Sequence, residues 1–574
     1  MENRSVDREK QERKYHSTER KLKIKFFQKM KSHFKSYCNH TSIHGFQYFG
    51  QNRTIIEKCW WTIVFMAIVS GCGFSIYLIY SKWRQSPVIV SLTTEDTPIY
   101  EVPFPAVTIC PTIKYSNDCM NFDALFENYN LTVEGREEIA EYIAQLCQWG
   151  SIFRNVEDLK ATFSNEIYKT FLKCSPYLVS EVNEEHVVNF MDELLSFRED
   201  FRPLITEDGL CFTFNMLSTE EVFSDATYIH PEYSSSGPKS QWIPQSGYRK
   251  KTDVYTYPRR ALWSGAANSL KVVLAHRKSD IDYMCTGAEQ GYKVILHLPT
   301  KMPRSILDYT MAPFGKATMI SVSALRMATS KVVESYSPRS RNCYFEGEKK
   351  LQFFKIYSFK NCAFECLTNF TLRECGCVGF YMPRNESTPI CGLSKAECLH
   401  FARKKYQLAK LKSKLKEKVY SFSTVSQSPT TKRTKTNTTN KNPRKKRESD
   451  NHSEDEEKNE ARCHCLRNCN DVTYTGSTTV LGYNWKKMSP EHMDLNSTLY
   501  DLTQISIYFE EGIILTIERN ELYGPTDFLS NFGGLLGLFS GFSIISIMEI
   551  IYFCTFRIIG NWKLFGRWHE EKIE

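Results

Sequence analysis

Two long apolar runs stand out along the chain, one near each end. Residues 60–80 (WWTIVFMAIVSGCGFSIYLIY) contain no charged residue, and residues 532–556 contain only Glu549. Each run reaches the roughly 20 apolar residues that a helix needs to cross a bilayer. We therefore expect a first transmembrane helix at 59–81 and a second at 527–556, which places both termini on the same side of the membrane.

The second apolar run is unusually rich in small and hydroxyl-bearing residues. Gly533, Gly537 and Gly541 recur at every fourth position, and serines lie at 540, 543 and 546. Small residues at this spacing let transmembrane helices pack closely. They are equally compatible with a pore lining, where a loosened backbone and free hydroxyls face water. Glu549 favours the pore, because an ionisable group at membrane depth usually faces a cavity or an ion pathway.

The region between the two runs carries short segments with strand-like apolar patterning, which predicts a β-rich body. Residues 134–149 and 181–197 differ, because apolar residues recur there at three- and four-residue spacings among acids, which predicts helices. The fold class is therefore α+β, with a large domain between two membrane helices. The predicted strands are at 104–111, 211–215, 293–299, 317–325, 504–509 and 513–518.

Sixteen of the twenty cysteines lie between the two apolar runs. An even and dense set in one compartment predicts a disulfide framework made in the secretory pathway. Zinc is the weaker alternative for the pairs Cys362/Cys366 and Cys375/Cys377, and no metal is expected. Six Asn-x-Ser/Thr sequons lie in the same region, which predicts a glycosylated extracellular domain at 82–526. The sequons are at Asn130, Asn369, Asn385, Asn437, Asn451 and Asn496.

The charge distribution assigns the tails to the cytoplasm. Residues 1–58 hold fourteen basic and six acidic residues, and residues 557–574 form a short second tail that begins with Arg557. By the positive-inside rule both tails are expected to be cytoplasmic. Between the spans, residues 403–447 hold sixteen basic residues and one acid, and residues 448–460 hold seven acids and one lysine. Apart from a short helix that Leu408, Leu411 and Leu415 could form, this composition predicts a disordered charged insert at 402–460.

The basic part of the insert ends in a motif that proteases of the furin type cut. The sequence Arg444-Lys-Lys-Arg447 fits the Arg-x-Lys/Arg-Arg pattern. Cleavage after Arg447 would separate the basic block from the acidic block. An uncut, solvated loop is an equally good interpretation.

No catalytic motif accompanies this layout, because a Gly-rich phosphate loop, HExxH and GxSxG are all missing from the sequence. We therefore expect no enzyme, and we expect no nucleic-acid partner. An adhesion protein or a non-conducting regulatory subunit would share the cysteines and sequons, but would not need the glycine-rich second run or Glu549. A trimeric ATP-gated channel would share the two spans but not the sixteen cysteines.

The order of apolar runs, motifs and cysteines along the chain resembles that of the degenerin/epithelial sodium channel superfamily, and within it that of the insect pickpocket channels. His44-Gly45 matches the family's His-Gly pair ahead of the first span, and residues 104–110 (FPAVTIC) match the signature after it. Residues 528–543 match the start of the family's pore helix, including its Gly-x-Ser element. The matching cysteine ladder comprises Cys343, Cys362, Cys366, Cys375, Cys377, Cys391, Cys398, Cys463, Cys465 and Cys469.

The resemblance implies a trimer in the plasma membrane, built from identical or related subunits. The extracellular domain would comprise a finger, thumb, palm, knuckle and β-ball. The implied function is a voltage-independent sodium channel of the amiloride-sensitive type, opened by an extracellular chemical or mechanical stimulus. Sodium would be the permeant ion, no cofactor is implied, and the extracellular ligand is not identified.

The resemblance also implies roles for single residues. Gly541, Phe542 and Ser543 would form the selectivity element. His44 and Gly45 would lie in a re-entrant segment below it and influence gating. The remaining residues assigned to the pore or gate are Ser530, at which bulky side chains would hold the gate open, Gly537, Leu538 and Glu549.

Six disulfides follow from the same resemblance, while Cys119, Cys147, Cys174 and Cys285 are left without assigned partners. The implied pairs are Cys110–Cys211, Cys343–Cys469, Cys362–Cys465, Cys366–Cys463, Cys375–Cys398 and Cys377–Cys391.

Overall fold

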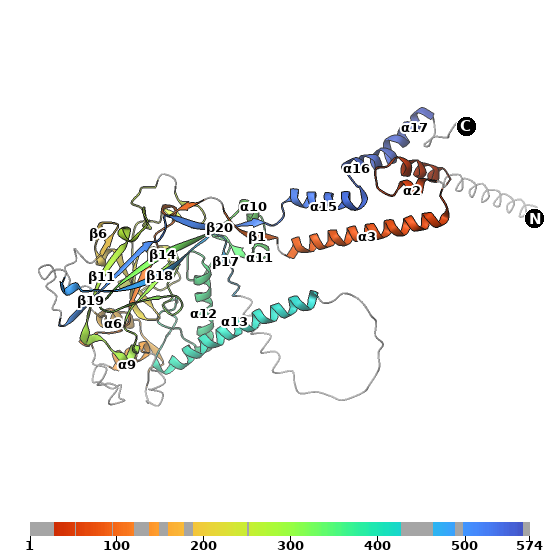
Figure 1. Ribbon diagram of the computed structural model, residues 1–574. Helices are drawn as coiled ribbons and strands as arrows, with labels where there is room; N and C mark the ends of the chain where they lie inside the picture. The colour runs from red at the N-terminus through yellow and green to blue at the C-terminus, as the bar shows by residue number, and fades with distance from the viewer. Residues whose placement is uncertain are drawn as a thin grey trace, which may run out of the picture. The chain divides into compact units, whose positions relative to one another are not determined.

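The computed structural model describes residues 28–51, 53–85, 87–93, 96–119, 137–147, 159–176, 188–249, 252–425, 463–487 and 498–565. The chain divides into two compact units. One unit combines the two ends of the chain, Met1–Ile89 and Asn520–Glu574, and the other is the intervening Val90–Arg519. Figure 1 shows the long helices of the first unit and the strands of the second.

A large mixed sheet forms the centre of the intervening unit, with the order β1-β20-β14-β19-β11-β5-β6. Strand β14 runs parallel to β19 and β20, whereas the pairs β11–β19, β11–β5, β5–β6, β14–β18 and β2–β20 are antiparallel. Strand β18 (Asp471–Gly482) pairs with β14, and β2 (Thr97–Pro98) pairs with β20. The other members are β1 (Val88–Leu92), β20 (Ile513–Glu521), β14 (Lys316–Thr329), β19 (Tyr500–Phe509), β11 (Leu270–Arg277), β5 (Val188–Phe190) and β6 (Glu193–Leu195).

A second, antiparallel sheet has the order β13-β12-β3-β8-β7. Its strands are β13 (Thr310–Pro313), β12 (Gly291–His297), β3 (Ala106–Pro111), β8 (Gly209–Phe214) and β7 (Phe201–Thr206). Three two-stranded pairs complete the described strands: β9 (Trp242–Ile243) with β10 (Gly247–Tyr248), β15 (Cys343–Tyr344) with β17 (Arg467–Asn468), and β16 (Ile390–Cys391) with β4 (Thr162–Phe163).

The main core brings the two sheets together around Phe104, whose side chain is fully buried. Its ring centroid lies 5.1 Å from that of Phe190, 6.4 Å from Phe214 and 5.7 Å from Phe509. Phe190 and Phe509 belong to the large sheet, and Phe214 belongs to the second sheet. Phe104 is part of the FPAVTIC run, so this run supplies both a strand and the contact between the sheets.

The long helices of this unit are α12 (Phe359–Cys375) and α13 (Ala396–Val425). Ser358 caps the start of α12 by accepting from Asn361 N, and Gly376 ends it in a left-handed conformation, as C-terminal glycines commonly do. The shorter helices are α5 (Glu137–Leu146), α6 (Ile167–Lys173), α7 (Phe197–Asp200), α8 (Thr219–Val222), α9 (Tyr283–Thr286), α10 (Lys331–Glu334) and α11 (Pro338–Arg341).

Helix α13 corrects the prediction of disorder over residues 402–460, because 402–425 are helical. This segment is rich in lysine, leucine and alanine, which are good helix formers. Ala402 is buried, and the ring of Tyr406 lies 5.5 Å from that of Phe370 on α12. Packing against α12 therefore extends the helix into the charged insert. Residues 426–460 lie outside the described residues.

The helix predicted over 181–197 is also wrong in its described part, since residues 188–195 form the hairpin of β5 and β6. Residues 181–187 lie outside the described residues. Val188 and Phe190 are buried, and β5 pairs with β11. Met191 and Asp192 form the turn with positive φ angles of 53° and 66°. Pairing with a distant strand and burial of the apolar side chains outweigh the helical spacing of the apolar residues.

The unit formed by the two chain ends is helical. Residues 28–40 are helical, and α2 (Gln47–Gly50) and α3 (Ile55–Gln85) follow. The second apolar run contains α15 (Pro525–Ser540), α16 (Ile544–Ile551), the π-helical turn η9 (Tyr552–Phe556) and α17 (Arg557–Phe565). Two stretches, Ile55–Arg84 and Ile544–Leu564, are long and apolar enough to cross a membrane. The predicted first span at 59–81 lies within α3, whereas the predicted second span is interrupted between α15 and α16.

Candidate functional site

The interruption of the second apolar run occurs at Gly541–Ser543. Helix α15 ends at Ser540, and Gly541 has φ +64°, a left-handed conformation that glycine adopts with little steric cost. Gly541 N donates to Gly537 O over 2.9 Å, and Phe542 N donates to Leu536 O over 3.3 Å. The α-helical pattern therefore ends here.

The next helix starts from Ser543. The Ser543 hydroxyl accepts from Ser546 N over 3.4 Å, and Ser543 N donates to the Ser546 hydroxyl over 3.1 Å, which is a reciprocal capping box. In an unbroken helix, Phe542 N and Ser543 N would donate to the carbonyls of Leu538 and Phe539. Because both N–H groups donate elsewhere, these two carbonyl oxygens do not receive their helical hydrogen bonds.

The segment ahead of the first span lies directly against this interruption. His44 N donates to the carbonyl of Ser540, the last residue of α15, over 2.9 Å. The imidazole of His44 contacts Gly541 so closely that a Cβ at position 541 would lie 2.7 Å from the ring. Gly45 follows with φ +86°. The structure thus brings His44 and the predicted selectivity element together, although they are almost 500 residues apart in sequence.

Glu549 contacts the same N-terminal segment. Its Oε2 atom accepts from Ser42 N over 2.8 Å and from the Ser42 hydroxyl over 3.3 Å. The Ser42 hydroxyl is also 2.7 Å from the hydroxyl of Ser546, which is fully buried. Sequence analysis missed Ser42 and gave Ser546 no separate role, because neither belongs to a motif.

Aromatic side chains hold the N-terminal segment against both membrane helices. The ring of Phe46 lies 6.1 Å from Tyr37 and 5.3 Å from Phe65 of α3. Tyr37 in turn lies 5.3 Å from Phe553 in the π-helical turn η9. The segment is therefore packed between the first apolar helix and the C-terminal part of the second apolar run.

The other residues predicted for the pore or gate lie on α15. Ser530 is exposed, and the Leu538 side chain is 80% exposed. A Cβ added at Gly537 would meet no atom within 4 Å among the described residues of this chain. Part of the α15 surface is therefore not covered by the described residues of the same chain. This is the arrangement expected of a helix that contacts neighbouring subunits.

The sixteen cysteines of the intervening unit form eight disulfides. Six of them are the pairs that the resemblance implied, from Cys110–Cys211 to Cys377–Cys391. The two further bonds are Cys119–Cys174 and Cys147–Cys285, which the motif had left open. Their four cysteines lie outside the cysteine ladder on which the resemblance rests, so the sequence did not assign their partners.

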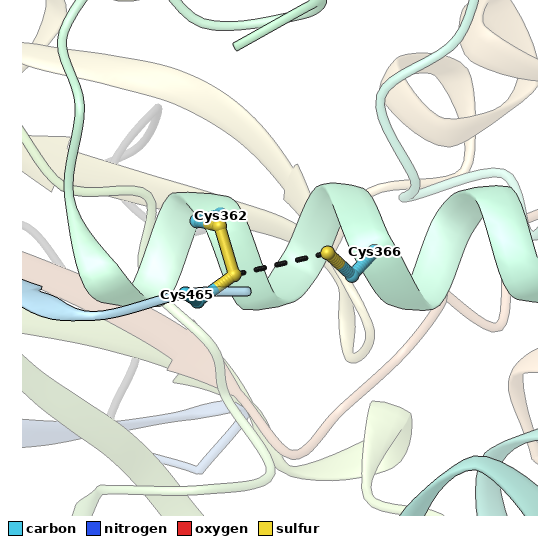
Figure 2. Close-up of side chains that lie close together, drawn as sticks. All are labelled: Cys362, Cys366 and Cys465. Carbon is cyan, nitrogen blue, oxygen red and sulfur yellow. Dashed lines mark hydrogen bonds between the residues drawn. A yellow bond between two sulfur atoms is a disulfide. The ribbon is translucent and has the colours of Figure 1, made fainter. Parts of the chain in front are cut away.

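The zinc alternative concerned the pairs Cys362/Cys366 and Cys375/Cys377. Cys375 and Cys377 are each bonded to another cysteine. Cys362 and Cys366 lie near Cys465, and the three sulfur atoms are within 4.8 Å of one another. Figure 2 shows the Cys362–Cys465 disulfide, with Cys366 Sγ 3.7 Å from Cys465 Sγ. Cys366 is itself bonded to Cys463. Zinc binds thiolates, and a disulfide sulfur is not a thiolate. These cysteines therefore act as covalent links between α12 and residues 463–465.

Comparison with known proteins agrees with this arrangement. The sequence model of the family described as "Amiloride-sensitive sodium channel" matches residues 37–553, from the N-terminal segment to the end of the second apolar run. The chain belongs to the amiloride-sensitive sodium channel family. It is therefore a subunit of a cation channel and a plasma-membrane protein with a large extracellular domain.

Individual relatives span most of the chain. Pickpocket protein 28 of Drosophila melanogaster is 25% identical over 562 residues, covering 94% of this chain and 80% of that protein. Acid-sensing ion channel 1A of Danio rerio is 23% identical over 546 residues, covering 89% and 85%. Bile acid-sensitive ion channel of Homo sapiens is 21% identical over 523 residues, covering 89% and 83%. The amiloride-sensitive sodium channel family consists of ion channels, not enzymes, and its members form multimers with related subunits.

Two sequons of this family member fall on described residues. Asn369 is exposed on α12, whereas Asn385 is partly buried and its Oδ1 atom has no hydrogen-bond partner among the described residues. Glycosylation at either position stays a prediction. Arg447 and the sequons at Asn130, Asn437, Asn451 and Asn496 lie outside the described residues.

Proposed function

We propose that three copies of this chain, alone or mixed with related subunits, surround a sodium-selective pore that opens in response to an extracellular chemical or mechanical stimulus. Conduction would be independent of voltage and blocked by amiloride, and both termini would be cytoplasmic. The observation that carries the proposal is the interruption of the second apolar helix at Gly541–Ser543.

The interruption supplies oxygen atoms at the place where an ion filter needs them. The carbonyls of Leu538 and Phe539 lack their helical donors, and Ser543 is exposed. Sodium is small and holds its water tightly, so a narrow ring of oxygens from three subunits can replace part of its hydration shell. In this arrangement Phe542 contributes its backbone rather than its ring.

Gating would be transmitted along the chain into the second membrane helix. Strand β20 ends at Glu521 and α15 begins at Pro525, so only three residues separate the large sheet from the pore helix. A displacement of β20 would therefore pull or tilt α15. The side chain of Asp527 caps the start of α15 by accepting from Gly524 N over 3.1 Å, so the helix has a defined first turn.

Expression in oocytes tests the proposal directly. The chain would be expressed alone and with related subunits, exposed to a panel of chemical and mechanical stimuli, and measured with and without amiloride. We expect an inward sodium current that amiloride blocks. Failure to record any cation current under every stimulus and subunit combination would favour a non-conducting regulatory subunit.

The selectivity element requires a separate test. Ser543→Cys is expected to change the sodium-to-potassium permeability ratio, which is measured from the reversal potential. Ser75→Cys is the matched control, because Ser75 is also a serine in a membrane helix and its hydroxyl donates to Gly71 O within that helix. An unchanged ratio in Ser543→Cys would remove Ser543 from the filter.

A further inference from the structure

Glu549 is the only Asp, Glu, Lys or Arg within the second apolar run, yet its carboxyl group accepts hydrogen bonds from the chain itself. Both polar groups of Ser42 approach the same oxygen atom, with Ser42 N at 2.8 Å and Ser42 Oγ at 3.3 Å from Oε2. These two residues are 507 positions apart in sequence. The contact therefore fixes the N-terminal segment to the inner part of the pore helix.

The hydrogen bonds around Ser42 can all run in one donor-to-acceptor direction, from Ser543 N to the Glu549 carboxyl. Ser543 N donates to Ser546 Oγ over 3.1 Å, which leaves the Ser546 hydroxyl proton available for Ser42 Oγ at 2.7 Å. The Ser42 hydroxyl can then donate to Glu549 Oε2. Each hydroxyl in this series accepts one hydrogen bond and donates the next, and the Glu549 carboxyl is the final acceptor.

We propose that Glu549 is a positioning residue for the selectivity element, which it holds through Ser42 and Ser546. On this view its acceptor oxygen matters more than any charge that it presents to the passing ion. The inference rests on the proposed function of Gly541–Ser543 as the filter. It differs from the interpretation of Glu549 as a member of a charged ring that lines the ion pathway.

The geometry supports a positioning role because the N-terminal segment contacts both sides of the interruption. His44 N is bonded to Ser540 O on the extracellular-domain side of the break in the chain, and Ser42 is bonded to Ser546 and Glu549 after the break. Further along the second apolar run, after Glu549, His33 Nε2 lies within hydrogen-bond distance of Phe553 O at 3.0 Å. The segment thus bridges α15 and α16, and Glu549 provides its anchor on α16.

Two substitutions at position 549 separate the two roles. Glu549→Gln keeps an acceptor oxygen and removes the negative charge, whereas Glu549→Ala removes both. A positioning role predicts that Glu549→Gln keeps the sodium-to-potassium permeability ratio within about twofold of the parent channel. It predicts that Glu549→Ala lowers the ratio by fivefold or more, and that Ser546→Ala does the same because it removes the link to Ser543 N.

A second measurement reports on the N-terminal segment independently of selectivity. A cysteine placed at Thr41, next to Ser42, would be labelled with a charged thiol reagent applied to the cytoplasmic face of excised patches. We expect Glu549→Ala to raise the rate of labelling by at least tenfold and Glu549→Gln to leave it unchanged. The parent channel without Thr41→Cys controls for the free cysteines at positions 38, 59, 72 and 554.

Glu57→Ala is the matched control for the loss of a carboxyl. Glu57 caps the first membrane helix through Thr54 N at 3.3 Å and belongs to the same unit as Glu549. It should change neither the permeability ratio nor the labelling of position 41. Surface protein would be quantified for every variant, so that loss of current through poor folding is distinguished from altered selectivity.

The outcomes separate this inference from the proposed function. Equal loss of selectivity in Glu549→Gln and Glu549→Ala would overturn the positioning role and indicate that the charge acts directly. Parent-like behaviour of Glu549→Ala in both measurements would also overturn it, as would faster labelling without a change in permeability. If Ser543→Cys leaves selectivity unchanged, the proposed filter fails, and the labelling experiment still decides whether Glu549 anchors the segment.

Discussion

Gly541 lies against the imidazole of His44. A Cβ built on Gly541 would be 2.7 Å from both Cδ2 and Nε2 of the ring, well inside van der Waals contact. The backbone of His44 is held close to Gly541, because the His44 N–H donates to Ser540 O over 2.9 Å. Position 541 is therefore restricted to glycine for two separate reasons, its φ of +64° and its contact with His44.

Gly541→Ala is expected to reduce the stimulus-evoked current per surface channel by about tenfold or more, because the left-handed backbone alone costs an alanine roughly 1–2 kcal/mol. Adding His44→Ala removes the steric contact but not the backbone strain. The double variant should therefore lose less current than the two single losses combined. The measurement is current amplitude normalised to surface protein.

Gly73→Ala is the control for the glycine substitution. Gly73 lies in α3, and a Cβ added there would meet no atom within 4 Å among the described residues. This variant should conduct as the parent channel does. Strictly additive losses in the Gly541/His44 pair would show that the contact between the two residues does not affect the open channel.

Ser530 gives a gain-of-function prediction. It is an exposed residue of α15, the helix proposed to surround the pore. Replacing Ser530 by valine or phenylalanine should keep neighbouring α15 helices apart and produce a standing inward sodium current without a stimulus. Asn531→Val is the control, since Asn531 is the next residue along and its side chain bonds back to Asp527 O. A silent Ser530→Phe channel with normal surface expression would contradict the assignment.

Local apolar patterning was sufficient to predict the strands near the core. The runs at 104–111 and 504–509 correspond to β3 (Ala106–Pro111) and β19 (Tyr500–Phe509), and both contribute side chains that are fully buried. In these segments the local preference and the long-range pairing agree. The pattern could also identify the interruption of the second span, because Gly541 and Ser543 are suited to end one helix and begin another.

The errors occurred where distant contacts outweigh local preference. Residues 188–195 have helical spacing, but β11 offers β5 a strand to pair with, and the hairpin forms instead. The charge of residues 402–425 predicts at most a short helix, but α12 provides a surface on which Ala402 is buried, and the helix extends to Val425. The contact between Ser42 and Glu549 joins the two ends of the chain, and no local pattern of either segment indicates it.

Two buried histidines predict acid sensitivity of the extracellular domain. Burial lowers the pKa of His276 to about 4, and burial likewise lowers the pKa of His297 to about 4. Between pH 6.5 and pH 4 the unfolded chain therefore binds more protons at these positions than the folded chain does. Stability falls as pH decreases through this window, by up to about 3 kcal/mol for each histidine.

His276→Phe tests this prediction. The ring of His276 stacks on Phe314 at 4.0 Å, and its Nδ1 atom has no hydrogen-bond partner among the described residues, so a phenyl ring fits the same surroundings. The variant should unfold at about the parent temperature at pH 7 and at a higher temperature than the parent at pH 4.5. Thermal unfolding of the purified full-length protein at both pH values is the measurement. Parallel pH curves for parent and variant would contradict the prediction.

The surroundings of Arg384 indicate that the protein's stability depends on the planar shape of this side chain as well as on its charge. It is only 2% exposed, and its Nη1 atom donates to the carbonyls of Asn385, Glu386 and Thr388 over 3.0, 3.1 and 3.0 Å. Its guanidinium also lies 4.8 Å from the ring centroid of Tyr228. Its Nη2 atom donates to the side-chain oxygen of Asn165, so both arms of the guanidinium bind neutral acceptors. The buried charge is thus stabilised by a planar fork of hydrogen bonds and by an aromatic face.

Lysine keeps the charge of Arg384 but cannot reproduce the fork or the flat stacking surface. Arg384→Lys should therefore destabilise the protein by roughly 3 kcal/mol, in the range expected for losing hydrogen bonds from a charged group and leaving buried carbonyls unpaired. The exposed Arg339→Lys is the control and should leave the unfolding temperature unchanged. Equal unfolding temperatures for Arg384→Lys and the parent would mean that a buried positive charge is enough at this position, and that the geometry of the guanidinium contributes nothing to stability.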